Sequence, residues 1–576
     1  MVEARVRGPC GVTAPGLIRR LFLAAIAALA ALPAPAATAA GQSAIASAHP
    51  LATEAGMEIL AKGGNAFDAA VAVSAALAVV EPNGSGMGGG GFYLLHRASD
   101  GKEVFVDARE VAPAAATRDM FLDATGEPVP GRSTRTALAA GIPGEPAGWG
   151  HLASTYGRLP LSESLGPAIR LARKGHTISA GRHAEIAAAL ADEELAGQGA
   201  TEFGRIFLVN GAAPPAGQLM RQPDLARSLE VLASGGAAAF YAGPFARRLV
   251  EGVRDLGGHW TLDDLANYRV IERVPIVTTY RGSRIVSAPP PSSGGLWLAT
   301  VLNVLSGYDL AELDSTTRKH LVLEAMRRGH RDRAQFLGDP AFTDVPVALL
   351  ASADYAAGLR ASIRTDRATP SEMLPGYVGS GARGRHTTHF SILDRDGNRV
   401  AASITLNGWF GTGLVIPGTG ILLNNQMDDF AMKAGAPNMY GLVGAEANAI
   451  LPGKRPLSSM SPTFVEDERG LVILGSPGGS FIPSMVLLGI FAWQQGAAAS
   501  DIVAAPRLHH QYLPDAVFAE PEALSAEERA GLEARGHSIR PWPDTIGNLQ
   551  VVTWDRMTGR VDAASDPRRT GGARVR

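Results

Sequence analysis

A predicted β-hairpin in the last third of the sequence constrains the fold more than any other feature. Two segments typical of strands, residues 388–393 and about 399–406, flank the run Asp394-Arg395-Asp396-Gly397-Asn398. Turn-forming Asp, Gly and Asn between two such segments predict an antiparallel hairpin with a five-residue loop. The chain therefore changes from a helical pattern to a β pattern close to residue 387.

The register of this hairpin follows from its turn. If the five residues form the loop, Leu393 lies opposite Arg399. The antiparallel ladder then places Thr387 opposite Thr405, so that two hydroxyl groups meet at the start of the hairpin. A slip of one residue would break this pairing.

The rest of the chain combines helical and β patterns. Residues 51–80 have helical spacing of apolar and small residues, and residues 92–107 are predicted to form a hairpin. Residues 145–370 are mostly helical in pattern, interrupted by a Pro-Ser-Gly run at 289–295. Further strands are predicted at 463–465, 471–474 and 549–554. The residues alone thus predict a mixed α and β protein without internal repeats.

Composition narrows the function classes. The chain has 576 residues, of which 46% are hydrophobic and 19% charged, so it can bury a large core in one domain or several. Its formal net charge is −2, and no basic stripe with interleaved aromatic residues is present. Nucleic-acid binding is therefore not indicated, and a small molecule or peptide is the expected partner.

The N-terminus has the pattern of an export signal. Arg19-Arg20 precede an apolar run at 21–32, and small residues at 37–39 could be cleaved by signal peptidase. We predict a signal peptide over 1–39 and a periplasmic or secreted protein, with no membrane attachment after its removal; a buried N-terminal helix is the alternative. Sec and twin-arginine export both remain open. The single cysteine, Cys10, lies in this segment, which excludes disulfides and thiol catalysis in the mature protein.

Two motifs suggest cofactors or metals only superficially. The loop at 84–89 fits the pattern GxGxxG, but a helix precedes it and a strand follows it, which is the reverse of a dinucleotide site. We interpret these glycines as permitting close backbone packing or lining a site. The adjacent His509 and His510 would point in different directions on any helix or strand, so a structural role is expected. We predict neither a cofactor nor a metal.

A series of motifs in order along the chain resembles one family. The block His386-Thr387-Thr388-His389 follows a polar, Gly- and Ser-rich segment at 365–385 that a cleavage could reach. Other matching blocks are GGNAFDAAVA at 63–72, Arg109-Glu110, the run at 289–295, NNQMDD at 424–429, PLSSMSPT at 456–463, GSPGGS at 475–480, PRLHHQ at 506–511 and ASDPR at 564–568. From about residue 44 to 570 the sequence is similar to the gamma-glutamyltransferase family of N-terminal-nucleophile hydrolases.

The resemblance implies a fold and a maturation step. The expected architecture is α+β, a four-layer αββα sandwich with two central sheets between helical layers. The precursor would cut itself before Thr387 into a large part, residues 40–386, and a small part, residues 387–576. Both parts would belong to one domain.

The resemblance also implies how Thr387 would act. A threonine hydroxyl is a poor nucleophile without a base, and cleavage frees an α-amine whose reference pKa is roughly 7.7–8.0. That amine would take the hydroxyl proton, so the uncut chain would be inactive. Thr405 would orient Thr387, and the backbone N–H groups of Gly478 and Gly479 would stabilise the oxyanion.

The remaining predicted site residues bind the two charged groups of a γ-glutamyl substrate. The resemblance assigns the α-carboxylate to Arg109, Ser458 and Ser459, and an Arg fork suits a carboxylate. It assigns the α-ammonium to Asn407, Gln426 and Asp429. Residues 434–453 resemble the lid loop of bacterial members, in which Tyr440 would shield the pocket. Trp409 departs from the smaller polar residues of many members and would either narrow the acceptor side or simply pack.

The implied function is transfer or hydrolysis of γ-glutamyl groups, with glutathione as substrate and water, an amino acid or a peptide as acceptor. Another amidase on the same scaffold, such as a cephalosporin acylase or a poly-γ-glutamate processing enzyme, is the first alternative. A catalytically inactive periplasmic glutathione-binding protein is the second. The acceptor, the ratio of hydrolysis to transfer and the oligomeric state stay open.

Overall fold

The computed structural model describes residues 39–374, 387–542 and 547–576. Residues 40–576 form one compact unit. The predicted signal peptide, except for its last residue Ala39, the segment 375–386 and the His386 side of the predicted cleavage lie outside the described residues. Among the described residues, no helix is both long and apolar enough to cross a bilayer.

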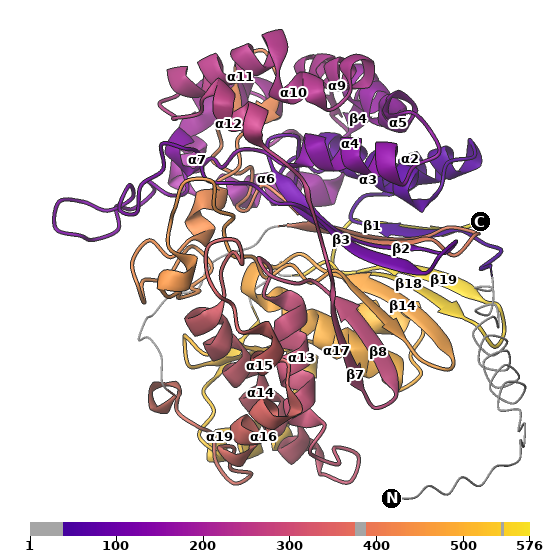
Figure 1. Ribbon diagram of the computed structural model, residues 1–576, viewed down its shortest axis with the longest axis vertical. Coiled ribbons are helices and arrows are strands. Elements are labelled where there is room, and N and C mark those ends of the chain that lie inside the picture. Colours follow the sequence, from indigo (N-terminus) through magenta and orange to yellow (C-terminus); the bar gives the residue numbers. More distant parts are fainter. Residues whose placement is uncertain (1–38, 375–386, 543–546) are drawn as a thin grey trace, which may run out of the picture. The chain divides into compact units, whose positions relative to one another are not determined.

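Two antiparallel sheets form the centre of this unit (Figure 1). The first sheet has the order β20 (Gly572–Val575), β1 (Ala44–Ser47), β9 (Thr388–Leu393), β10 (Arg399–Thr405), β2 (Gly90–Arg97), β3 (Lys102–Ala108) and β6 (Ile271–Arg273). The second has the order β19 (Val561–Ser565), β18 (Gln550–Asp555), β14 (Gly470–Gly475), β13 (Thr463–Glu466), β8 (Ser283–Ser287) and β7 (Ile276–Tyr280). The sheets stack face to face, with β9 and β10 against β14 and β18.

Helices cover the outer face of each sheet. The first sheet is covered by α2 (Pro50–Ala61), α3 (Ala66–Val80) and α4 (Glu145–Thr155), with α5 (Leu161–Lys174) and α9 (Pro223–Gly235) behind them. The second is covered by α13 (Gly294–Leu305), α17 (Ile482–Gln494) and α18 (Ala499–Ala504), with α14 (Ser315–Phe336) behind α13. The predicted four-layer α+β sandwich is therefore confirmed.

Shorter elements complete the chain. The remaining helices are α6 (Ala180–Ala189), α7 (Glu193–Ala196), α8 (Glu202–Phe207), α10 (Ala238–Tyr241), α11 (Gly243–Asp255), α12 (Leu262–Asn267), α15 (Val347–Leu350), α16 (Ala353–Ala361) and α19 (Ala526–Ala534). Small sheets join β4 (His176–Thr177) to β5 (Leu219–Met220), β11 (Val415–Ile416) to β12 (Ile421–Leu422), and β15 (Leu508–His510) to β16 (Val517–Ala519) and β17 (Ile539–Pro541).

The two largest hydrophobic clusters follow these layers. One joins α2, α3, α5 and α9 to the outer face of the first sheet, and every residue of α3 is buried. Most side chains of α3 are small and apolar, so neighbouring elements can pack closely against the helix. A helix that is apolar on most of its surface must be covered on all sides, as α3 is. The other cluster fills the space between the sheets and extends to α13 and α17.

The predicted register of the central hairpin is confirmed. Leu393 pairs with Arg399, and Thr388 pairs with Ile404. The carboxylate of Asp394 holds the turn, because it accepts the backbone N–H groups of Asp396 and Asn398 at 3.0 and 2.9 Å. The turn chemistry that the sequence predicts thus fixes which side chains face each other.

One local prediction needs correction, and another is confirmed with an addition. The helical pattern at 51–80 is two helices, because Gly63 adopts a φ of +93° that ends α2, and Asn65 then caps the start of α3. The middle segment, predicted to be mostly helical, also contains the β7–β8 hairpin. Its turn has positive φ at Arg281 and Gly282, +48° and +83°, which is the backbone of a two-residue hairpin loop.

Gly475 on β14 tests how tightly the sheets pack beneath the start of β9. A Cβ atom at this glycine would lie less than 3.0 Å from the ring of His389, which is fully buried. We expect Gly475→Ala to lower the free energy of unfolding by about 1–3 kcal/mol, the usual cost of overpacking. Urea unfolding of the purified protein measures this.

The matched control is Gly358→Ala on α16, where an added Cβ meets nothing within 4 Å. This substitution should leave stability unchanged or raise it by up to about 1 kcal/mol, because alanine favours helix. Equal stabilities of the two variants would contradict the described sheet contact.

Candidate active site

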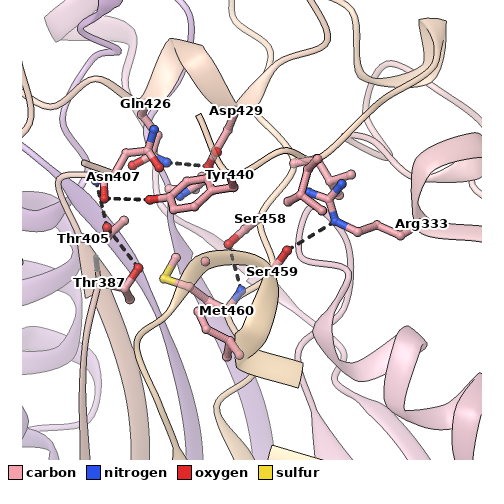
Figure 2. Close-up of a pocket in the computed structure, with 15 residues that line it drawn as sticks. Arg333, Thr387, Thr405, Asn407, Gln426, Asp429, Tyr440, Ser458, Ser459 and Met460 are labelled. Carbon is pink, nitrogen blue, oxygen red and sulfur yellow. Dashed lines mark hydrogen bonds and ion pairs between the residues drawn. The ribbon is translucent and has the colours of Figure 1, made fainter. Parts of the chain in front are cut away.

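A small pocket brings together nearly all the residues that the sequence predicts for a site (Figure 2). Its lining includes Arg109, Thr387, Thr405, Asn407, Gln426, Asp429, Tyr440, Ser458, Ser459 and Gly479. Gly478 precedes Gly479 directly and is not itself part of the lining. The free volume is only about 20 Å³, little more than one water molecule requires. The side chains around the pocket therefore leave little free space in it.

The two threonines meet as the register predicts. The hydroxyl oxygens of Thr387 and Thr405 are 3.3 Å apart, and both side chains are buried. Thr405 Oγ also accepts the backbone N–H of Asn407 at 2.8 Å. Because a hydroxyl has one hydrogen, Thr405 can still donate that hydrogen to Thr387. Thr387 is thus held by a neighbour whose own position is fixed.

The glycine-rich loop at 84–89 packs against the backbone of Thr405. It lies between α3 and β2, in the predicted order of helix and strand. A Cβ atom at Gly89 would collide with the carbonyl of Thr405, and one at Gly88 with the carbonyl of Leu422. Close backbone packing, one of the two predicted roles, is therefore confirmed for these glycines.

Gly478 and Gly479 begin the short 3₁₀ turn that leads into α17. Their φ angles are +135° and +57°, a region that L side chains rarely adopt. A Cβ atom at Gly479 would also collide with the ring of Tyr440. Both the backbone conformation and the contact with Tyr440 therefore require glycine here.

A buried ion pair forms one wall of the pocket. Arg109, just beyond β3, donates from Nη2 to Asp429 Oδ2 at 2.5 Å and from Nε to the carbonyl of Pro456 at 3.2 Å. Gln426 Nε2 donates to the same carboxylate oxygen of Asp429 at 2.7 Å. Burial raises the pKa of Asp429, and the charge of Arg109 opposes this shift.

The serine pair forms another wall. Ser458 Oγ accepts the backbone N–H of Met460 at 3.1 Å, and Ser459 Oγ accepts Nε–H of Arg333 at 3.3 Å (Figure 2). The backbone of Ser458 is fixed by Ser293, whose N–H and hydroxyl both donate to its carbonyl, at 2.8 and 2.9 Å. The Pro-Ser-Gly run at 289–295 thus supports the serine loop.

Tyr440 covers the pocket. Its hydroxyl donates to the carbonyl of Asn407 at 2.8 Å, and its ring packs against Gly479. The loop around it is held by Asp428, which accepts the backbone N–H of Met439 at 2.9 Å. Only 4% of Tyr440 is exposed, and its side chain is part of the pocket lining.

Two buried charged residues at this site are absent from the sequence prediction. Arg333, on α14, lines the pocket beside Ser459. Glu110 is fully buried next to Arg109, and neither of its carboxylate oxygens has a hydrogen-bond partner in the described part of the chain. Burial raises the pKa of Glu110 to about 8. The only sequence signal for Glu110 is its place after Arg109, and Arg333 is one of several arginines in a charge-rich helix.

Trp409 does not belong to the pocket lining. It is buried in a separate hydrophobic cluster with Phe203, Phe207 and Phe410. Of the two predicted roles for this residue, the structure supports packing.

His509 and His510 both form hydrogen bonds within the protein. His509 bonds through Nδ1 to Ser484 Oγ at 2.7 Å, as a structural role predicts.

Three potential metal ligands, His320, Glu324 and His537, lie close together in the interior. However, His320 Nδ1 and His537 Nε2 share a hydrogen bond of 2.8 Å. Glu324 also forms ion pairs with Arg327 and Arg328, whose charges would repel a cation.

Comparison with known proteins agrees with this geometry. The family model for gamma-glutamyltranspeptidase matches residues 52–575. The chain is 41% identical over 540 residues to a glutathione hydrolase proenzyme of Pseudomonas sp. (strain A14), covering 92% of this chain and 93% of that protein. It is 41% identical over 538 residues to a glutathione hydrolase proenzyme of Escherichia coli (strain K12), covering 92% and 90%.

The structural likeness extends over the same length. The crystal structure of a cephalosporin acylase from Bacillus halodurans matches with a TM-score of 0.81 and 28% identity, covering 94% of this chain and 98% of that chain. Family model, relatives and fold agree on one family. The chain belongs to the gamma-glutamyltranspeptidase family, and it is an enzyme of the γ-glutamyl transferase and hydrolase type.

Proposed function

We propose that this protein transfers and hydrolyses γ-glutamyl groups, with glutathione as a substrate, through a covalent ester on Thr387. The observation that carries the proposal is the arrangement of one pocket, in which a threonine hydroxyl lies near an arginine, a carboxylate and two serines. A γ-glutamyl group has an electrophilic carbonyl at one end and an α-carboxylate and α-ammonium at the other. The pocket offers a complementary group for each.

Maturation is the first step of the proposal. The hydroxyl of Thr387 attacks the carbonyl carbon of His386, so that an ester forms and the peptide C–N bond breaks. The nitrogen takes a proton and becomes the free α-amine of Thr387, and water then hydrolyses the ester. The products are the proposed large part, residues 40–386, and small part, residues 387–576. The relatives named proenzymes support this step.

Acyl transfer then uses the new amine. The α-amine of Thr387 takes the hydroxyl proton as the oxygen attacks the γ-carbonyl, and it returns the proton to the leaving amine. The N–H groups of Gly478 and Gly479 stabilise the oxyanion, and such a donor is typically worth about 2.7–4 kcal/mol. The hydroxyl of Thr405, 3.3 Å away, orients Thr387. Water or an amine finally attacks the γ-glutamyl ester and releases Thr387.

The charged end of the substrate is held by the two walls of the pocket. Arg109, Ser458 and Ser459 bind the α-carboxylate. Asn407, Gln426 and Asp429 bind the α-ammonium, for which Asp429 supplies the opposite charge. Since the pocket is nearly filled, the lid loop at 434–453 must move Tyr440 before substrate enters.

We also propose export through the signal peptide at 1–39, with action in the periplasm or outside the cell.

An acylase is the second candidate, favoured by the fold likeness to a cephalosporin acylase. The ion pair at Asp429 favours the γ-glutamyl reaction, because a glutaryl group lacks the ammonium that this carboxylate would bind. Turnover of γ-glutamyl anilide and of a glutaryl cephalosporin separates the two. Tight binding of glutathione without turnover of either substrate would instead support an inactive binding protein.

Removing the hydroxyl of Thr387 tests both proposed steps. We expect Thr387→Ala to remain a single chain on a denaturing gel and to lose at least about 1,000-fold in γ-glutamyl anilide turnover, because the nucleophile acts in both reactions. Thr387→Ser keeps a hydroxyl and should still mature, although more slowly. Substantial activity of Thr387→Ala would refute the mechanism.

The pH dependence tests the α-amine as the base. Only the neutral amine can take a proton, so kcat/KM should fall by about tenfold per pH unit below its pKa, for which the reference range is roughly 7.7–8.0. The rate should level off above that pKa. Steady-state assays of the matured enzyme between about pH 6 and pH 9 measure the profile. A flat profile across this range would argue against the amine.

A further inference from the structure

Arg333 is a buried cation that forms no ion pair with any residue the structure describes. It lies on α14, it is 4% exposed, and it lines the pocket. No carboxylate oxygen of a described residue lies within 4.0 Å of a guanidinium nitrogen of Arg333, the distance that defines an ion pair. Burial lowers the pKa of Arg333 to about 10, which still leaves it protonated at neutral pH. An uncompensated buried charge is costly, so a group that binds here and carries a negative charge would gain from it.

Arg109 differs from Arg333 in this respect. Its guanidinium already forms an ion pair with Asp429 at 2.5 Å and donates to the carbonyl of Pro456. The same carboxylate must also serve the substrate ammonium under the proposed function. Of the two guanidinium groups in the pocket, Arg333 is therefore the one that forms no ion pair with a described residue, and the charge of Asp429 acts on it only from a greater distance.

The serine hydroxyls are arranged to donate. Ser459 Oγ accepts Nε–H of Arg333, and Ser458 Oγ accepts the N–H of Met460. Each oxygen therefore uses a lone pair on an N–H donor, while its own hydrogen stays available for a further acceptor. An ionised carboxylate only accepts hydrogen bonds. It could therefore accept one from each serine hydroxyl while it lies beside the guanidinium of Arg333. Figure 2 shows Ser459 between Arg333 and Ser458.

We infer that Arg333 determines specificity for the α-carboxylate: it supplies a positive charge that no ion pair with a described residue neutralises, and it orients the Ser459 hydroxyl toward that group. This inference rests on the proposed γ-glutamyl function and adds a residue to the carboxylate site. Ser459 transmits the effect of Arg333 by hydrogen bonding, and the charge acts across the pocket.

The test compares two substrates that differ only in the carboxylate. γ-Glutamyl p-nitroanilide carries it, and 4-aminobutyryl p-nitroanilide has hydrogen in its place. For Arg333→Gln we expect kcat/KM to fall roughly 10- to 100-fold with the first substrate, the range for a hydrogen bond to a charged group. The fall should lie mainly in KM. With the second substrate the change should be less than about threefold.

Inhibition gives an independent readout on the same variant. L-Glutamate and 4-aminobutyrate differ by the same α-carboxylate, and both resemble the hydrolysis product. Arg333→Gln should weaken inhibition by L-glutamate by a similar factor and leave inhibition by 4-aminobutyrate nearly unchanged. The matched control is Arg331→Gln on the same helix, which pairs with Asp332 outside the pocket lining and should behave like the wild type.

Maturation into two fragments reports whether each variant folds. If Arg333→Gln does not mature, Arg333→Lys carries the test, because it keeps the charge and loses the Nε–H donor. It should lose activity selectively toward the carboxylate-bearing substrate, by a smaller factor.

Equal losses with both substrates, or no loss at all, would overturn the role of Arg333 while leaving the proposed function intact. A matured wild-type enzyme that does not turn over γ-glutamyl p-nitroanilide would instead overturn the proposed function itself.

Discussion

The register of the β9–β10 hairpin is the constraint on which the site depends. Asp394 fixes this register from the turn, since its buried carboxylate also accepts the backbone N–H of Ala66 at 2.9 Å and so ties the hairpin to the first turn of α3. At the other end, Thr405 pairs with Gly90 on β2. A slip of one residue would turn Thr387 or Thr405 to the opposite face of the sheet and separate the two hydroxyls.

The polar pocket lies in the buried interior, where apolar side chains would contribute more to the stability of the folded protein. Arg109, Asp429, Arg333 and Glu110 are all buried at or beside it. Arg109 and Asp429 form a close ion pair, Glu110 lies 4.0 Å from Arg109, and Arg333 forms no ion pair with a described residue. Burying unpaired charge and unsatisfied carboxylate oxygens destabilises the folded state. The large apolar clusters on both sides of the sheets offset this cost. Buried polar and charged groups of this kind, within a core that is otherwise apolar, are typical of functional sites.

Features set by neighbouring residues could be predicted from the sequence. The hairpin at 388–405 and the strands around 464, 472 and 552 follow from short-range turn chemistry and apolar patterning, and the structure has them within one or two residues. The family resemblance added the residues that converge on the pocket, whose roles stay proposals.

Features set by distant contacts could not be predicted. The division of the helical pattern at 51–80 is an exception, because its cause is local: Gly63 adopts a positive φ and Asn65 caps the next helix, and the spacing of apolar residues does not reveal either. Arg333 resembles the other arginines of α14, and only its approach to Ser459, far along the chain, distinguishes it. Trp409 could be assigned to packing only after the phenylalanines of its cluster were placed.

The central claim is that Thr387 becomes an N-terminal residue and carries the γ-glutamyl group. The most direct measurement is the denatured mass of the matured protein after rapid quenching with a γ-glutamyl substrate in the absence of an added acceptor amine. We expect two fragments, with the smaller beginning at Thr387 and a fraction of it heavier by one γ-glutamyl group on that residue. A single uncut chain, or a γ-glutamyl group on any other residue, would contradict this claim.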